Sequence, residues 1–135
     1  NWLRHVQEVR DRHLTLLNSL PPALRLNTLC ELNVLEQSRN VCRTTVVEEA
    51  WLRSQEVVVH GWVYGLHNGL IEDLRMTVAC TEDVEPAYSR ALATLTQRAL
   101  AAATRYPEGS AAAAAVSLRT GSPEPAPPAA PTPGP

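Results

Sequence analysis

The segment from Val57 to Leu74, VVVHGWVYGLHNGLIEDL, constrains the fold of this chain more than any other part of it. Its first eight residues alternate between two faces, and both faces carry apolar or aromatic side chains. A strand of this kind usually lies inside a sheet that is covered on both sides, as in α/β folds. Asn68-Gly69 then predicts a two-residue type I′ turn, because both residues accept a positive φ. We therefore predict a long buried strand over 57–64 and a short hairpin partner.

The composition changes near the C-terminus. The chain has 135 residues, and from Pro107 onward it consists mainly of Pro, Ala, Gly and Ser. Such a segment buries too little apolar surface to offset the entropy of ordering it. We predict one domain over 1–106 and a disordered tail over 107–135. The chain begins at Asn1 without a Met and directly on a helical pattern, so we expect it to be a fragment.

Charge and cysteine content limit the function classes. The net charge is −2 without blocks of one sign, which argues against nucleic acid as a partner. No apolar run approaches the roughly twenty residues that cross a bilayer, so we expect no membrane partner. Cys30, Cys42 and Cys80 are odd in number and lack the paired spacing of zinc ligands, which favours reduced core thiols in a cytoplasmic protein.

Helical periodicity surrounds the predicted strand. A first helix over 2–20 ends at Pro21-Pro22, and a second begins near Ala23 and runs to Asn40 with apolar residues on more than one face. We expect this second helix to be packed on several sides, within the domain or at a subunit interface. A third helix opens with a capping box at Thr45 and Glu48, and a fourth has Pro86 in its first turn.

One strand with one short partner is an incomplete sheet. A two-stranded sheet is marginal alone, yet a strand that is apolar on both faces requires neighbours. The mismatch indicates that strands preceding Asn1, or a partner chain, complete the sheet.

Several short motifs follow one another along the first hundred residues: NWL from Asn1, LCELNV from Leu29, EQ at 36–37, AW at 50–51, HGWVYG from His60 and NGL from Asn68. Their order and spacing resemble the C-terminal half of a bacterial β-class carbonic anhydrase. The resemblance implies an α/β fold in which helices flank a mostly parallel sheet, and in which the HGWxYG strand joins parallel strands of the N-terminal half. It also implies assembly into homo-oligomers.

The implied reaction is the reversible hydration of carbon dioxide to bicarbonate by a zinc-bound hydroxide. Members of the family hold zinc through the motifs Cys-x-Asp-x-Arg and His-x-x-Cys, and neither motif occurs in this chain. In the family both motifs lie upstream of the position of Asn1. We therefore predict no catalytic residue and no metal ligand here, and no activity for this chain alone. The alternative is a non-catalytic interaction or dimerisation module derived from the family.

Tyr64 is the one residue to which the resemblance gives a site role. In some bacterial members the tyrosine of HGWxYG helps to form a non-catalytic bicarbonate pocket, together with a Trp and an Arg from the N-terminal half. The alternative is a strand aromatic whose hydroxyl is satisfied by a nearby group.

Other polar residues favour structural interpretations. A histidine side chain can shuttle protons, but the place of His60 in an apolar strand predicts a hydrogen-bonded core histidine. His67 at the turn should be solvated. On the second helix, Glu31, Asn33, Glu36 and Gln37 are predicted to make buried hydrogen bonds within a surface that faces the sheet or a dimer partner. The spacing of five residues between Glu31 and Glu36 places them on different faces, which argues against a paired-carboxylate acid–base site.

Overall fold

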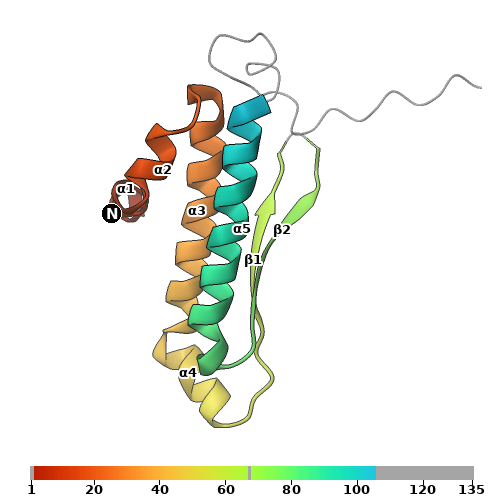
Figure 1. The fold of residues 1–135 in the computed structure, drawn as a ribbon. Coiled ribbons are helices and arrows are strands. Elements are labelled where there is room, and N and C mark those ends of the chain that lie inside the picture. Colours follow the sequence, from red (N-terminus) through yellow and green to blue (C-terminus); the bar gives the residue numbers. More distant parts are fainter. Residues whose placement is uncertain (1, 67, 106–135) are drawn as a thin grey trace, which may run out of the picture.

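The computed structural model describes residues 2–66 and 68–105 (Figure 1). The predicted solvated His67 and the predicted disordered tail over 107–135 lie outside these residues. Within them, no helix has both the length and the apolar content needed to cross a bilayer. The elements in chain order are α1 (Trp2–Arg12), α2 (Leu14–Asn18), α3 (Pro22–Cys42), α4 (Thr45–Leu52), β1 (Val59–Tyr64), β2 (Ile71–Val78), the 3-10 turn η1 (Thr81–Asp83) and α5 (Val84–Arg105).

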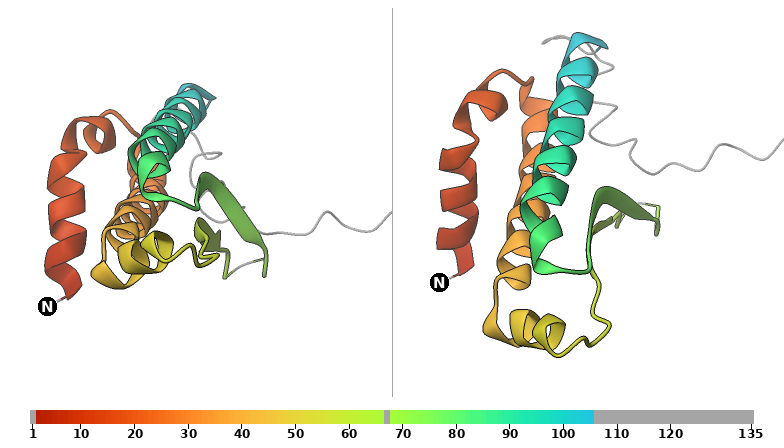
Figure 2. Two further views of the ribbon diagram at one scale, coloured as in Figure 1. Left: turned by 90° about the horizontal axis from the view of Figure 1, so that it is seen from below. Right: turned by 60° about the horizontal axis from the view of Figure 1, so that its bottom comes forward.

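The helices and the hairpin form layers. α3 and α5 lie side by side against one face of the β1–β2 sheet, and α1 packs on α3 on the side away from the strands (Figures 1 and 2). This arrangement confirms the predicted α/β class in its coarse form. In the described part of the chain β1 and β2 pair antiparallel, so the mostly parallel sheet remains a prediction.

The proline pair separates two helices, as predicted. Pro21 has an extended backbone (φ −55°, ψ 145°) before α3, and Pro22 occupies the first helical position, where its missing N–H costs no hydrogen bond. The single helix predicted over 2–20 is divided at His13, whose φ of −107° and ψ of 20° leave the helical region.

The predicted capping box at Thr45 and Glu48 is wrong. The residue that precedes α4 is Thr44, and its side chain makes no capping hydrogen bond to that helix. Its hydroxyl instead donates to the carbonyl of Val41 at 2.7 Å. The short α3–α4 connection therefore uses the threonine to satisfy the end of α3 rather than the start of α4.

The core lies between α3, α5 and the sheet. Leu32 and Leu35 of α3 and Met76 and Val78 of β2 are completely buried. α3 contacts α1, α2, α4, α5 and both strands, which confirms that it is packed on several sides. Gly61 permits this packing, because a Cβ at that position would lie 3.2 Å from Met76 Cβ and 3.4 Å from Ser38 Oγ.

The returning strand is longer than predicted. β2 has eight residues and β1 has six, since β1 begins at Val59 rather than Val57. The register shifts between Gly61, which pairs with Met76, and Trp62, which pairs with Asp73. The two extra residues of β2 form a bulge in which Arg75 has a φ of 63° and donates its N–H to Asp73 Oδ1 at 2.8 Å.

The hairpin loop is also longer than a two-residue turn. Gly65 N–H donates to the Leu70 carbonyl at 2.8 Å, and Gly69 N–H donates to the Gly65 carbonyl at 2.8 Å. The side chain of Asn68 accepts a hydrogen bond from Leu70 N–H at 3.0 Å, which closes an Asx-type turn. Gly69 has the expected positive φ of 68°. The hairpin is therefore confirmed, whereas the two-residue turn is wrong.

One face of β1 is open, contrary to the prediction. Val59 and Val63 are partly buried against the helices, but Trp62 is 49% exposed and Tyr64 is 60% exposed. The predicted core histidine is wrong as well, because His60 is exposed. It does make a hydrogen bond, with Nδ1 3.0 Å from Thr77 Oγ1, and its ring stacks on Trp62 at 4.7 Å. Within the described residues nothing covers this face.

Candidate functional site

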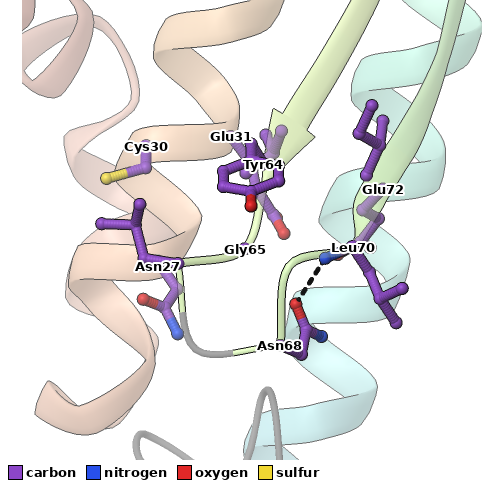
Figure 3. Close-up of a pocket in the computed structure, with 11 residues that line it drawn as sticks. Asn27, Cys30, Glu31, Tyr64, Gly65, Asn68, Leu70 and Glu72 are labelled. Carbon is purple, nitrogen blue, oxygen red and sulfur yellow. Dashed lines mark hydrogen bonds between the residues drawn. The ribbon is translucent and has the colours of Figure 1, made fainter.

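An open pocket of about 500 Å³ lies where β1 ends and the hairpin loop begins (Figure 3). β1, α3 and the start of β2 converge there. The side chain of Tyr64 lies in this pocket beside Glu31, whereas the Cys30 sulfur points away from Tyr64. The lining residues are Asn27, Cys30, Glu31, Val63, Tyr64, Gly65, Leu66, Asn68, Leu70, Ile71 and Glu72.

Hydrogen bonds of the loop shape this pocket. The Gly65–Leu70 bond and the Asn68 side chain fix the path of the chain just beyond Tyr64 (Figure 3). A Cβ at Gly65 would lie 2.4 Å from Asn68 Oδ1, so only glycine allows the amide group to turn inward there. The pocket wall therefore depends on the glycine that ends the HGWVYG motif.

Two carboxylates of the pocket share one cation. Arg98 of α5 lies 2.7 Å from Glu31 through its Nη2 atom, and its Nη1 atom pairs with Glu72. Burial raises the pKa of Glu31, and the neighbouring Arg98 offsets only part of that effect. Among the described residues that line the pocket there are two carboxylates and no cation. The lining is therefore suited poorly to an anion unless another cation joins it.

A second polar cluster surrounds Glu36, which is 1% exposed. Arg12 Nη1 donates to one carboxylate oxygen at 2.5 Å, and the Tyr88 hydroxyl donates to the other at 2.5 Å. His13 Nε2 lies 3.2 Å from that second oxygen. Burial alone would raise the pKa of Glu36, but the hydrogen bonds from Tyr88, Arg12 and His13 outweigh burial and lower it. The predicted buried hydrogen bonding of Glu36 is confirmed.

The Glu36 cluster joins three helices. Burial and the Glu36 carboxylate raise the pKa of Tyr88, so its hydroxyl remains a donor. Arg39 lies over the Tyr88 ring, 4.7 Å from its centroid, and holds Glu85 through two bonds of 2.8 Å. Glu31 and Glu36 thus belong to separate networks, as the helical spacing predicted. Sequence reasoning missed Arg12 and Tyr88, because their contact with Glu36 depends on how α1 and α5 pack against α3.

The thiols and imidazoles do not assemble a metal site. Cys42 is buried as predicted, but Cys30 is exposed and Cys80 is only partly buried, so a core role for all three is wrong. Over 2–66 and 68–105 no group of three or more His, Cys, Asp or Glu side chains is placed to hold a metal ion. The donor set of the described residues therefore does not fit zinc.

Comparison with known proteins decides the family. Residues 1–71 match the sequence profile of the family described as carbonic anhydrase. The chain belongs to the carbonic anhydrase family. A curated relative, a carbonic anhydrase of Emericella nidulans, is 38% identical over 76 residues, which is 56% of this chain.

Comparison with solved structures identifies the class of carbonic anhydrase that this chain resembles. A β-carbonic anhydrase of Coccomyxa, solved in complex with acetazolamide, aligns with a TM-score of 0.60 and 32% identity over 69% of this chain. The resemblance to β-class carbonic anhydrases is thereby confirmed. This carbonic anhydrase chain spans only 33% of the length of the Emericella relative and 44% of the Coccomyxa chain.

Proposed function

We propose that this chain forms part of a carbonic anhydrase that reversibly hydrates carbon dioxide to bicarbonate with zinc as cofactor. The family match over residues 1–71 is the observation that carries the proposal. The described residues do not fit zinc, and neither ligand motif of the family occurs in the sequence, so the proposal assigns the metal ligands to residues outside this chain. Alone, the 135-residue chain is expected to bind no catalytic zinc and to have no hydratase activity.

A chimera tests this proposal directly. The 76-residue region of the Emericella carbonic anhydrase that aligns with this chain is replaced by the corresponding residues of this chain. We expect the chimera to retain one zinc per chain by elemental analysis and to hydrate carbon dioxide in a stopped-flow indicator assay. A folded chimera that lacks activity would contradict the proposal.

The matched control removes the thiols of this chain. In the same chimera, Cys30, Cys42 and Cys80 are replaced by Ser wherever they fall within the exchanged region. If the zinc ligands lie elsewhere, zinc content should not change. Loss of zinc from this variant would show that the replaced thiols bind the metal after all. Stoichiometric zinc with hydratase activity in the isolated chain would contradict the proposal equally.

Bicarbonate regulation through Tyr64 is a further part of the proposal. Its support is the position of Tyr64 in an open pocket at the end of β1. Because the described lining residues provide two carboxylates and no cation, bicarbonate binding there requires a cation from beyond this lining. In the active chimera, Tyr64→Phe should weaken inhibition by bicarbonate. Unchanged inhibition would remove Tyr64 from any effector site.

The proposed protein is cytoplasmic and assembles as a homo-oligomer. Free thiols at Cys30, Cys42 and Cys80 favour a reducing compartment. The open face and open edge of β1 favour assembly, and they also support the second candidate, a non-catalytic interaction module.

A further inference from the structure

The donors around the buried Glu36 carboxylate differ in charge according to the helix that supplies them. On the α5 side the donor is the Tyr88 hydroxyl, which is neutral. On the α1 side the donors are Arg12, a permanent cation, and His13, whose imidazole is cationic in acid. Glu36 therefore binds α5 through a neutral group, whereas it binds the junction of α1 and α2 through groups that carry or acquire positive charge.

The other charge next to Glu36 is also positive. Arg39, on the same helix, interacts with Glu36 through its charge. The carboxylate of Glu85 is already bound to Arg39 by two hydrogen bonds of 2.8 Å. α2 has no charged side chain, and among the described residues no charged group of α4 or the strands lies among the partners of Glu36. If Glu36 lost its charge, Arg12, His13 and Arg39 would repel one another around a neutral group.

The segment formed by α1 and α2 contributes few side chains to the core. Of residues 3–20 only Val9, Leu17 and Leu20 are buried. The segment lies on the side of α3 away from the strands (Figures 1 and 2). The core between α3, α5 and the sheet contains other residues, of which Ala91 and Met76 are completely buried. That core does not depend on the segment, whereas α1, with 11 residues, is marginal as an isolated helix in water.

We propose that the Glu36 carboxylate is an acid-sensitive attachment point for the α1–α2 segment (residues 2–20). When the carboxylate is neutralised, this segment leaves α3 as a unit, while α3, α5 and the hairpin stay folded. The direction follows from the donors. The Tyr88 hydroxyl can still donate to the oxygen of a neutral group, whereas Arg12 and His13 lose their counter-charge. The released state is a local opening of the fold.

Glu36→Gln tests the proposal at neutral pH, because the amide resembles a neutral carboxyl group in size and shape. Acid alone would not isolate Glu36, since burial raises the pKa of Glu31 and its pairing with Arg98 would be lost as well. The measurement is hydrogen exchange of the full chain. In the variant, amides over 6–12 should exchange within about tenfold of an unstructured peptide, whereas amides over 91–99 should remain protected by at least about a hundredfold.

A second substitution separates repulsion from the loss of a hydrogen bond. Adding Arg12→Gln to Glu36→Gln removes one of the facing cations and lets two amide groups bond, so protection over 6–12 should return by about tenfold. Arg10→Gln is the matched control, because Arg10 lies on the same helix and pairs with its neighbour Asp11. Adding Arg10→Gln to Glu36→Gln should leave the segment released.

Acid should reproduce the release in the unmodified chain. Burial would raise the pKa of Glu36, but the hydrogen bonds from Tyr88, Arg12 and His13 outweigh it and lower the pKa. The attachment is therefore present above the ordinary value of 4.5 and is lost as pH falls through the lower folded value. Exchange over 6–12, corrected for the intrinsic effect of pH, should show this midpoint in the unmodified chain and not in Glu36→Gln.

Defined results would overturn the proposal. Amides over 6–12 that stay as protected in Glu36→Gln as in the unmodified chain would show that the carboxylate does not hold the segment. Loss of protection over 91–99 as well would show that the whole fold opens together. Equal protection with Arg12→Gln and with Arg10→Gln would exclude charge as the cause. These outcomes are independent of the chimera's zinc content and hydratase activity, so either proposal can fail without the other.

Discussion

The Glu36 cluster and the open face of β1 differ in how far their side chains are buried and paired. Glu36 is almost fully buried, and donors from α1, the α1–α2 junction and α5 satisfy its two oxygens. Among the described residues no buried side-chain N or O atom lacks a partner. On β1, large aromatic side chains remain half exposed beside an unpaired backbone edge. The helical side is complete in itself, whereas the sheet side depends on something outside the described residues.

The largest loss of stability is expected from removing the Glu36 carboxylate on the helical side. Glu36→Ala leaves the buried Tyr88 hydroxyl and the part-buried His13 without their acceptor, and should lower the free energy of unfolding by about 4 kcal/mol. Urea denaturation of the full chain measures this loss. Glu85→Ala is the control, since its carboxylate is half exposed and should contribute less than about 1 kcal/mol. Equal losses of unfolding free energy in the two variants would show that the buried carboxylate contributes no more than the exposed one.

The pH dependence of the same residue follows from its lowered pKa. A carboxyl group whose pKa is lower in the folded state stabilises the fold above its unfolded pKa, and this stabilisation is lost as pH falls through the folded pKa. The difference in unfolding free energy between the unmodified chain and Glu36→Gln should therefore be constant near neutral pH. It should shrink as the pH falls below about 4.5, the ordinary value for the group. A difference that widened in acid would mean that the pKa is raised.

Next in size is the contrast between the two faces of the sheet. Met76 is completely buried against the helices, and Met76→Ala should cost about 3 kcal/mol through the cavity it leaves. Trp62→Ala, on the open face, should cost the monomer less than about 1 kcal/mol despite the larger truncation. Thermal unfolding at low protein concentration compares the two. A larger loss for Trp62→Ala would show that the open face is covered.

A smaller effect is expected where β1 approaches α3. Gly61→Ala brings a methyl group within 3.2 Å of Met76 Cβ, which should destabilise the chain by about 1–2 kcal/mol through overpacking. Denaturant midpoints of the variant and the unmodified chain give the difference. Neutrality or stabilisation would show that the sheet can move away from α3 at little cost.

The smallest effect should be favourable. At the end of α4, Ser54 has a φ of 57°, while Ser54 N–H donates to Trp51 and Gln55 N–H donates to Ala50, both at 2.9 Å. This is the Schellman arrangement, which glycine fits best. Ser54→Gly should raise the unfolding free energy by about 0.5 kcal/mol. A decrease would mean that the serine side chain stabilises this end more than its strained backbone costs.

The sequence predicted those features of the fold that depend only on residues close together in the chain. The proline pair, the hairpin and the separate faces of Glu31 and Glu36 follow from backbone chemistry and helical spacing, and the structure confirms them. Other features depend on contacts between distant segments. The bulge at Arg75, the exposure of His60 and the donors of Glu36 arise only when β2, α1 and α5 pack against α3. The motif resemblance identified the family, whereas the residues around Tyr64 required the folded hairpin.

The bulge in β2 also bears on aggregation. Arg75 and its neighbours interrupt the outer edge of β2, so a strand of another molecule cannot pair regularly along its whole length. The hairpin is therefore protected on this side from the edge-to-edge association to which a regular exposed strand is prone.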